Sequence, residues 1–392
     1  MKIAVIGSGT VGVMSTCHFL YYLPECSVDC IYDPNKKILG IGESTNIQFP
    51  DLLYKAANYN CFLDNKELDL TFKYGVLYKN WRKEDFLSPI IPPNYAFHFN
   101  NFKLKEVIFN KLKNIYKKRF KEIFGEVKIL SNTLTNVELS INNKTKTYDY
   151  VIDCRGYPED YSDYVQSDFL PLNHALVYMI KEPGEWKFTY HQATKNGWMF
   201  GIPLQTRQGW GYLFNDRITS VEEAKKDIAD IFKIKNLNEV NFNEFKFKPY
   251  HAKKFLDNRI LKNGNQAIFY EPIEALSGVF YDNINRALID FILKRKTEND
   301  VNLYLFDMAK RYENFICFVY QGGSTFNSNF WKDTIVKTKN HLKNNKEWEQ
   351  TIQFINNKKN HEFSLGNSLE SFPFCIKLYK QLSNNFNYKF FK

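Results

Sequence analysis

A glycine-rich turn near the N-terminus constrains the fold of this 392-residue chain more than any other feature. Gly7, Gly9 and Gly12 form a GxGxxG pattern directly after an apolar strand at residues 2–6, and a helix is expected from residue 11 to about residue 23. Glycines permit the tight turn and let backbone N–H groups approach a pyrophosphate, which the helix N-terminus stabilises. The order strand, turn, helix predicts a Rossmann-like dinucleotide-binding core.

An acidic residue follows at the distance that such a core requires. A second strand is expected over Val28–Tyr32, and Asp33 closes it 21 residues after Gly12. A carboxylate in this position binds ribose in Rossmann-like units. The alternative is a turn that is merely rich in glycine, and FAD and NAD share the fingerprint, so this region alone does not choose between them.

The charge balance limits the partners to be expected. The formal net charge is +10 and the pI is near 9.0, which can attract nucleic acid or an anionic membrane, or favour an anionic cofactor. The lysines are scattered through many segments, and the local cluster Lys111, Lys113, Lys117 and Lys118 is typical of a solvated helix face. We therefore do not expect nucleic acid to be the main partner.

Cysteine usage and hydropathy point to one compartment. The seven cysteines include no CxxC pair and no Cys/His cluster at zinc spacing, a pattern typical of a reduced intracellular protein without a metal. Single histidines such as His174 and His191 lack a second ligand at metal spacing. The chain enters a strand at once and has no apolar run of membrane-spanning length, so we expect a cytoplasmic protein without signal peptide or membrane contact. Monomer and homo-oligomer both remain open.

Periodicity gives a coarse reading of the other elements. Residues 46–120 are expected to be mostly helical, interrupted by a strand over Thr71–Tyr78 and a loop around residues 89–94. The later expectations are a hairpin with its turn at Asn142 and Asn143, a strand ending at Asp153, strand-like alternation over residues 165–260, a helical pattern from residue 285 onward, and a solvated helix or connection over Lys339–Asn360.

Five further segments carry distinctive patterns: GIGEST at residues 40–45, TFKYG at 71–75, DCRG at 153–156, GWMFGIPL at 197–204 and GNQAIFYEPIEALS at 264–277. In this order they resemble the strap, the lysine segment, the internal flavin turn, the WxWxIP signature and the flavin- and halide-contacting segment of the flavin-dependent tryptophan halogenase family. The resemblance spans about residues 1–335. It implies FAD, used as FADH2 from a separate flavin reductase, together with O2 and a halide ion.

The resemblance also implies the architecture. The expected fold class is α/β, with a Rossmann-like FAD-binding core of the flavin monooxygenase type, an interleaved sheet-bearing substrate lobe and a helical C-terminus. The core is expected over residues 1–60, 100–165 and 255–290, the substrate lobe over 61–99 and 166–254, and the helical region over 291–392.

Residues expected to bind the cofactor follow from the matched motifs. They are Gly7, Gly9, Thr10, Gly12, Asp33, Gly40, Gly42, Glu43, Ser44, Thr45, Asp153, Gly156, Asn265 and Pro272. Asn265 departs from the family, which usually has Asp there, so that a neutral amide would meet the ribityl chain.

Lys73 has two interpretations. Strand alternation puts the even-numbered residues from Phe72 to Tyr78 on one apolar face and Lys73 on the other, beside Gly75. Spacing alone favours a surface lysine, because lysines are mostly exposed. The resemblance instead implies a catalytic group, which as an ammonium would hydrogen-bond hypohalous acid and as an amine would form a haloamine.

Glu274 has a similar pair of interpretations. It could cap a helix that starts near Ala275, since anions favour helix N-termini. The resemblance implies the second catalytic residue, which would polarise the oxidised halogen or take the arenium proton. Backbone N–H groups of Leu276 and Ser277 are implied to bind halide, and Glu271 is expected to orient the loop.

A wall between flavin and substrate is the last implied feature. Hypohalous acid would travel past Trp198 and Pro203 to Lys73, and separation of the two chambers would prevent direct oxygen transfer. The expected tunnel and substrate residues are Trp198, Phe200, Ile202, Pro203, Tyr95, Phe97 and His98. Phe200 replaces the second Trp of the WxWxIP signature.

The expected activity is halogenation of a small, electron-rich aromatic substrate with chloride, bromide or iodide. The chain is shorter than tryptophan-specific members of the family, whose C-terminal region helps enclose the indole, so free tryptophan is not the expected substrate. Two alternatives remain: a flavin-dependent monooxygenase that hydroxylates an aromatic substrate, and a non-catalytic basic flavoprotein that binds a macromolecular partner. A weaker idea is a carrier-bound substrate, because a charge of +10 would suit an acidic carrier.

Overall fold

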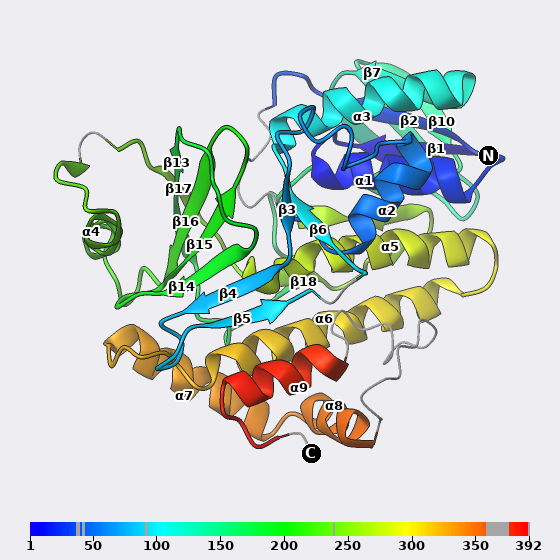
Figure 1. The fold of residues 1–392 in the computed structure, drawn as a ribbon. Helices are drawn as coiled ribbons and strands as arrows, with labels where there is room; N and C mark the ends of the chain where they lie inside the picture. The colour runs from blue at the N-terminus through cyan, green and yellow to red at the C-terminus, as the bar shows by residue number, and fades with distance from the viewer. Residues whose placement is uncertain (37–39, 41–43, 91–92, 238–239, 358–375, 391–392) are drawn as a thin grey trace.

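A largely parallel sheet of six strands organises the N-terminal part of the protein (Figure 1). The computed structural model describes residues 1–36, 40, 44–90, 93–237, 240–357 and 376–390. The strands lie in the order β19 (Leu256–Asp257), β20 (Ile260–Lys262), β11 (Tyr150–Asp153), β1 (Lys2–Ile6), β2 (Ser27–Tyr32) and β7 (Phe120–Phe124). Only the β19–β20 pair among them is antiparallel. The predicted Rossmann-like α/β fold is confirmed.

Both faces of this sheet are covered, which is why its central strands are almost continuously apolar. On one face lies α1 (Thr10–Tyr22), which contacts α2 (Gln48–Ala57), α3 (Asn101–Tyr116) and α5 (Leu276–Ile292). Residues Gly12–Leu20 of α1 are all buried, as expected of a helix packed on every side. On the other face, apolar residues of an antiparallel sheet formed by β8 (Val127–Asn132), β9 (Val137–Ile141) and β10 (Lys144–Tyr148) complete a second core.

The expected hairpin turn is present between β9 and β10. Asn142 and Asn143 have φ angles of 49° and 64°, the left-handed conformation that a two-residue hairpin turn requires at both positions. Asparagine tolerates this conformation better than most residues.

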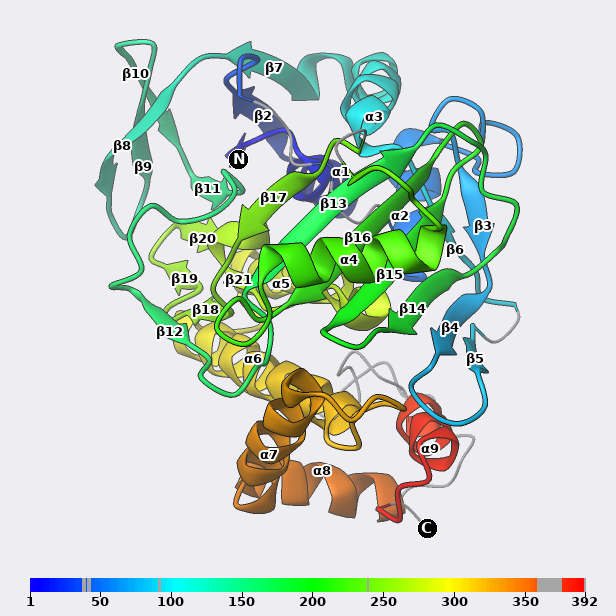
Figure 2. The same ribbon diagram turned by 90° about the vertical axis from the view of Figure 1, so that its left-hand side faces the viewer.

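A seven-stranded sheet forms the second large layer. Its order is β17 (Asn243–Lys246), β13 (His174–Ile180), β16 (Gln208–Phe214), β15 (Trp198–Pro203), β14 (Thr189–Ala193), β4 (Gly75–Lys79) and β5 (Phe86–Pro89). Figure 2 shows α4 (Val221–Phe232) lying across this sheet, where it buries Ala224 and Ile228. The strand-like alternation predicted for residues 165–260 is confirmed, apart from this helix.

The single strand expected over Thr71–Tyr78 is wrong. The chain breaks at Tyr74 into β3 (Thr71–Lys73), which pairs with β6 (Ala96–His98), and β4, which pairs with β5 and β14. The interpretation of residues 46–120 as mostly helical is also wrong, because the described residues between α2 and α3 form the strands β3 to β6 and connecting turns and loops, with no helix. The break matters for function because side-chain alternation does not continue across Tyr74, so the face on which a β4 residue lies relative to Lys73 cannot be read from its spacing.

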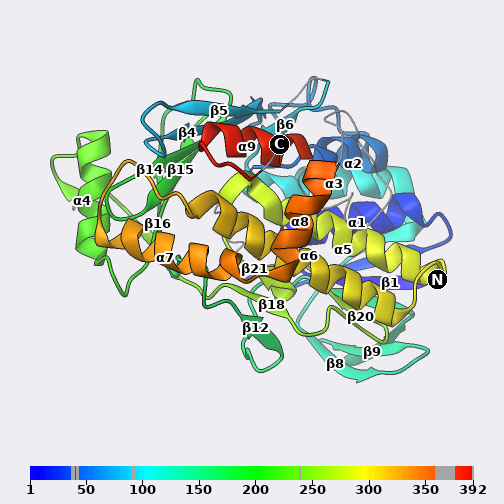
Figure 3. The ribbon, with the colours of Figure 1, turned by 90° about the horizontal axis from the view of Figure 1, so that it is seen from below.

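Helices dominate the C-terminal part, as the sequence predicts (Figure 3). They are α6 (Glu298–Tyr320), α7 (Asn329–Lys343), α8 (Lys346–Asn357) and α9 (Ile376–Asn385). A short sheet of β12 (Tyr164–Gln166), β18 (Tyr250–Ala252) and β21 (Ile268–Phe269) lies beside α6, where the His251 ring is 5.2 Å from the Phe306 ring. The helix α8 lies in the stretch expected to be solvated, yet it buries Trp348 and Ile355.

The segment after α9 is tied to β4 and β5. Arg82 donates hydrogen bonds to the carbonyl oxygens of Phe386 and Gly323 and to the Tyr388 hydroxyl. Its guanidinium also lies over the Phe386 and Tyr388 rings, at 4.8 and 5.5 Å from their centroids. Across the described residues, no helix has the length and apolar character needed to cross a membrane.

Candidate active site

Lys73 is a buried lysine rather than a surface one. It ends β3 with 3% of its surface exposed, and its Nζ donates a hydrogen bond to Ser44 Oγ at 3.0 Å. Burial lowers the pKa of Lys73 to about 8, and the nearby carboxylate of Glu274 opposes that fall. At neutral pH the side chain is therefore a desolvated ammonium that readily gives up a proton.

Glu274 does not act as a helix cap. It lies in the turn η4 (Ile273–Ala275), and Ala275, the N-cap of α5, makes no side-chain capping hydrogen bond. Glu274 and Ala275 have φ angles of 56° and 55°, a left-handed conformation that is strained for residues with a Cβ. Two such residues in succession separate Glu274 from the helical backbone of α5, and its carboxyl is near enough to Lys73 for each group to influence the pKa of the other.

Tyr78 contacts Glu274 and was not among the expected site residues. Its hydroxyl donates to Glu274 Oε1 at 2.5 Å, and its side chain is fully buried. Burial of the carboxyl raises the pKa of Glu274, and the Tyr78 hydrogen bond and the Lys73 charge lower it. Strand alternation had assigned Tyr78 to an apolar face opposite Lys73. A buried tyrosine usually needs a partner for its hydroxyl, and that rule could have identified it.

Trp198 of β15 is held by a hydrogen bond in a fully buried aromatic cluster. Its indole Nε1 donates to the Tyr320 hydroxyl at 2.5 Å, and its ring lies 4.9 Å from His191 and 6.2 Å from Trp81. These contacts fix the orientation of the indole. Tyr320 also influences Glu271, since burial raises the pKa of Glu271 to about 8 and the hydroxyl of Tyr320 opposes that rise.

The rest of the expected wall is tied to the lysine strand. Phe200, Ile202 and Pro203 follow Trp198 along β15, and the Pro203 carbonyl accepts a hydrogen bond from Thr71 Oγ1 at 2.6 Å. Phe200 and Ile202 are buried. This hydrogen bond places the end of β15 next to the strand that carries Lys73.

The three residues expected to meet the substrate near β6 have different environments. His98 is buried, lies 2.8 Å from Thr189 Oγ1, and has a pKa well below its ordinary value because of burial and the Lys73 charge. Phe97 packs in the core against Phe49 and Phe99. Tyr95 is partly buried against Phe62 and Phe72. The structure therefore brings His98, and not the other two rings, into the electrostatic surroundings of Lys73.

The glycine turn fits a bound pyrophosphate. A Cβ on Gly12 would lie 2.0 Å from the Gly7 carbonyl oxygen, and one on Gly7 would lie 2.6 Å from the Cys154 carbonyl oxygen. A Cβ on Gly9, the N-cap of α1, would meet no protein atom within 4 Å. Protein atoms thus leave no room for side chains at Gly7 and Gly12, whereas the space at Gly9, in front of α1, is free of protein atoms. No side chain caps the backbone N–H groups at this end of α1.

Three other expected cofactor residues lie at or just after the carboxyl ends of β2 and β11, the two strands that flank β1. Asp33 follows β2, partly exposed, and accepts the Asn35 N–H. Asp153 ends β11 and is paired with Arg155 at 2.6 Å. Gly156, with φ +102°, again faces open space. Open space at Gly9 and at Gly156 fits an extended dinucleotide, and the residues present are compatible with FAD.

Four further expected residues make contacts within the protein. Asn265 accepts the Tyr281 hydroxyl at 3.1 Å, and Pro272 precedes η4. A Cβ on Gly40 would overlap the Phe102 ring, and Thr45 accepts the Phe97 N–H. Gly42 and Glu43 lie outside the described residues.

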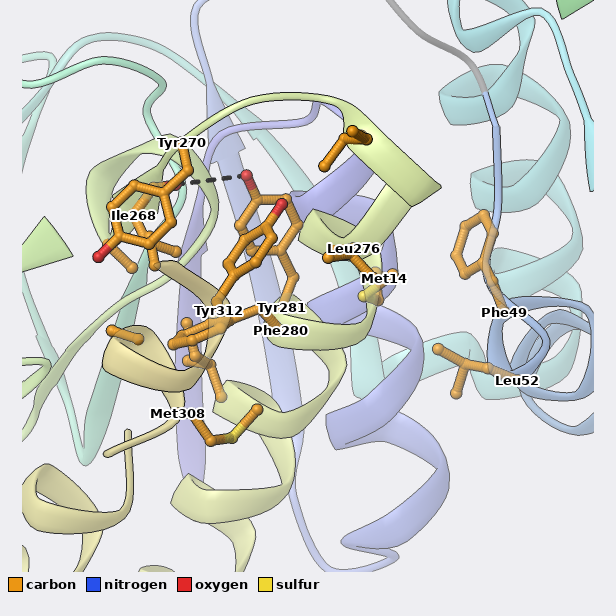
Figure 4. Packing of buried hydrophobic residues seen from close by; sticks show 14 of the residues in the cluster. Met14, Phe49, Leu52, Ile268, Tyr270, Leu276, Phe280, Tyr281, Met308 and Tyr312 are labelled. Atoms are coloured by element: carbon orange, nitrogen blue, oxygen red, sulfur yellow. Dashed lines mark hydrogen bonds between the residues drawn. The ribbon is translucent and has the colours of Figure 1, made fainter. Parts of the chain in front are cut away.

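The residues expected to bind halide begin α5 (Figure 4). Leu276 is buried in the cluster that includes Met14 of α1 and Phe280 of α5. Ser277 Oγ lies 3.2 Å from the Tyr312 hydroxyl. The first turn of α5, like that of α1, has no side-chain cap, so its N–H groups are suited to an anion.

In the part of the chain that the structure describes, potential metal ligands and cysteines are dispersed. No group of three or more His, Cys, Asp or Glu side chains there could hold a metal ion. The described cysteines are free thiols, and burial raises the pKa of each of them.

Comparison with known proteins gives a consistent result. A family model described as tryptophan halogenase matches residues 2–131 and 84–369. Among curated relatives, tryptophan 7-halogenase KtzQ of Kutzneria sp. (strain 744) is 26% identical over 160 residues, 38% of this chain and 29% of KtzQ. Tryptophan 6-halogenase SttH of Streptomyces toxytricini is 24% identical over 264 residues, 61% of this chain and 49% of SttH. The chain thus spans between about a third and a half of these relatives.

Solved structures share the fold over nearly the whole chain. A tryptophan halogenase from Shewanella frigidimarina NCIMB 400 has a TM-score of 0.79 at 16% identity, covering 99% of this chain and 89% of that one. BrvH, a flavin-dependent halogenase from Brevundimonas sp. BAL3, has a TM-score of 0.78 at 14% identity, covering 99% and 90%. At these identities the likeness establishes the fold.

Proposed function

This chain belongs to the tryptophan halogenase family, and on that premise we propose that it halogenates an electron-rich aromatic substrate with a halide ion, O2 and FADH2 supplied by a separate flavin reductase. The observation that carries the proposal is the buried Lys73 together with Glu274, whose carboxylate is near enough to influence the pKa of the lysine. A hydroxylating monooxygenase needs neither group, and an ammonium and a carboxylate withdrawn from water lower stability, which makes the pair a candidate functional site.

The cofactor would be held at the N-terminus of α1. Gly9 and Gly156 leave space for it, and Asp33, which follows β2, would bind the ribose. FAD in its reduced form supplies, with O2, the oxidation of halide to hypohalous acid. The uncapped N–H groups of Leu276 and Ser277 would hold the halide.

The residues of this chain then carry the second half of the reaction. The Lys73 ammonium hydrogen-bonds the oxygen of hypohalous acid and makes the halogen more electrophilic. The arene attacks the halogen, and the O–X bond breaks as Lys73 gives its proton to the oxygen, which leaves as water. Glu274 accepts the proton from the ring, and its transfer back to Lys73 restores both groups. A haloamine on neutral Lys73 is the alternative form of the same delivery.

The wall at Trp198 keeps the two halves apart. We propose that Trp198, Ile202 and Pro203 separate the flavin from the arene, supported by the hydrogen bonds that fix Trp198 and Pro203 in place. Phe200 stands where relatives carry a second Trp, and we expect a small arene other than free tryptophan as the substrate. Efficient single-position halogenation of tryptophan would contradict that substrate class.

The test is a product assay on matched variants. Wild type, Lys73→Ala, Glu274→Gln and the control Lys79→Ala are given a flavin reductase, O2, each halide in turn and a panel of phenols, indoles and pyrroles. Isotope patterns in mass spectra identify halogenated products. Wild type and Lys79→Ala should halogenate, because Lys79 is partly exposed and its side chain leaves β4 on the face opposite to Tyr78, which contacts Glu274. Lys73→Ala should lose halogenation by roughly two or more powers of ten while reduced flavin is still oxidised.

Two outcomes would overturn the proposal. Halogenation by both Lys73→Ala and Glu274→Gln at the wild-type rate would show that the roles are wrong. Hydroxylated product alone, with bromide present, would favour the monooxygenase.

A further inference from the structure

We propose that Tyr78 is a positioning residue for Glu274: its hydroxyl holds one carboxylate oxygen and leaves the other free to accept the proton from the substrate. The inference rests on the proposed function, because it concerns the proton acceptor of that reaction. Tyr78 itself need not touch the substrate. Its effect is exerted through the direction and the ionisation of the carboxylate that it contacts.

The first support is the rigid setting of the Tyr78 ring. It stacks on Phe86 at 4.8 Å, and its edges meet the rings of Trp81, His191 and Phe386 at 5.2 to 5.6 Å. Register fixes the same arrangement, since Tyr78 pairs with His191 on β14 and with Phe86 on β5. The ring has no room to turn, so its hydroxyl stays 2.5 Å from Glu274 Oε1.

The second support is the conformation of Glu274. Its φ of 56° and that of Ala275 are strained for residues with a Cβ, and such strain persists only where surrounding contacts determine it. Glu274 lies before α5 and not within it, so no helix holds its backbone. The Tyr78 hydrogen bond is a contact that aims the side chain.

The third support is the charge environment. Burial favours the neutral carboxyl, whereas the hydrogen bond from Tyr78 and the charge of Lys73 favour the carboxylate. His98 and His191 are buried with pKa values well below the ordinary range, so neither adds positive charge at neutral pH. The titratable groups that face the Tyr78–Glu274 pair come from five elements or segments: Lys73 on β3, His191 on β14, Glu271 before η4, Tyr320 on α6 and Tyr388 after α9.

The sign of the effect follows. Without the Tyr78 hydroxyl, the carboxyl keeps its burial and loses a contact that favours the charged form, so the pKa of Glu274 rises. A proton acceptor must be ionised to work. The rate should therefore begin to fall at a higher pH, on the acidic side of the profile, with little change in KM.

Tyr78→Phe tests this with a matched control. Tyr212→Phe removes another fully buried hydroxyl that donates to a carboxylate, that of Asp227 at 2.6 Å, in the core between the large sheet and α4. The first measurement is the halogenation rate from pH 5 to 9. The second needs no turnover: infrared titration of the carboxyl band that is absent from Glu274→Gln.

In Tyr78→Phe, both the acidic limb and the carboxyl titration should move up by roughly one pH unit, which lowers the rate on that limb roughly tenfold. Tyr212→Phe should leave both at the wild-type position. If Tyr78→Phe fails to fold, fluorotyrosine at position 78 makes the phenol a stronger donor and should move both measurements to lower pH.

An unchanged limb and an unchanged titration in Tyr78→Phe, or in the fluorotyrosine protein, would overturn the inference. Equal shifts in Tyr212→Phe would also overturn it, because they would arise from general loosening of the core. Absence of halogenation by wild type would instead refute the proposed function, and the infrared titration would still decide the role of Tyr78.

Discussion

Replacing Lys73 by methionine should abolish halogenation and yet make the protein more stable at neutral pH. The lysine is 3% exposed, and burial lowers its pKa from 10.5 to about 8. The unfolded chain therefore binds the proton more tightly than the folded one. The buried charge therefore lowers the free energy of unfolding. This loss of stability is fully present below pH 8, amounts to about 3 kcal/mol at pH 7, and disappears as the pH rises through 10.5.

Methionine keeps the length of the side chain and removes the charge. Two contacts offset part of the gain, because Ser44 loses a donor and Glu274 loses a neighbouring cation and takes up a proton more readily. We expect Lys73→Met to raise the unfolding free energy at pH 7 by about 2 to 3 kcal/mol, and by about 1 kcal/mol or less at pH 10.

Urea unfolding followed by tryptophan fluorescence, at pH 7 and at pH 10, measures both values. Lys79→Met on β4 is the control, since Lys79 is partly exposed and lies in the strand that follows β3. A Lys73→Met protein less stable than wild type at pH 7 would refute the reasoning. A gain of the same size at both pH values would show that better packing, not the loss of a buried charge, causes it.

Gly9→Ala should lower FAD affinity roughly tenfold or more in a fluorescence titration, because the new methyl group fills the space before α1. The unfolding temperature should stay unchanged, because that methyl group meets no protein atom. Unchanged FAD affinity would contradict the prediction. Gly12→Ala should instead destabilise the protein without any cofactor, since its Cβ would lie 2.0 Å from a backbone oxygen; a wild-type melting curve would show that the turn relaxes. Phe386→Ala removes a buried ring whose centroid lies 5.4 Å from that of Tyr78, and it should lower the unfolding free energy in urea by about 3 kcal/mol and reduce kcat. If neither value changes, the C-terminal segment does not support the site. If the ammonium of Lys73 is the working form, the halogenation rate should fall as the pH rises through about 8, whereas a rate that rises there would favour the haloamine.

The Rossmann-like part could be predicted from the sequence because its determinants are local. The strand, the GxGxxG turn and α1 lie within the first 22 residues, and α1 begins within one residue of the expected position. The hairpin at Asn142 and Asn143 is specified by two residues whose conformation matches a two-residue turn. Neither conclusion needs information about distant parts of the chain.

The break at Tyr74 could not be predicted in this way. Alternation over Thr71–Tyr78 is the same whether the strand is continuous or divided, and the division is set by partners far along the chain, β6 for the first half and β14 for the second. The helix α4 had a usable local signal that was overlooked: Ser220 and Glu223 form a capping box, with each side chain bonded to the other residue's backbone N–H.

The proposed catalytic pair, Lys73 and Glu274, marks the limit of reasoning from residue type. Lysines are mostly exposed, and the spacing around Lys73 gave no reason to bury it. Only the resemblance to a family paired it with Glu274, which lies 201 residues further along the chain. The structure adds what the resemblance did not contain, the contact of Tyr78 with that glutamate.

Features that break local rules gather at this site. A lysine is buried, a partly buried carboxylate lies near enough to influence its pKa, and two residues with side chains adopt a left-handed backbone. Each lowers stability, and none would persist in a loosely packed region. The surrounding shell consists of buried aromatic rings whose polar atoms are also hydrogen-bonded, as the Trp81 indole is to the His191 carbonyl and the Trp198 indole to the Tyr320 hydroxyl. Such a shell holds Lys73 and Glu274 in one geometry, which the proposed reaction requires because the lysine must meet hypohalous acid while the glutamate accepts the proton of the arene that attacks it.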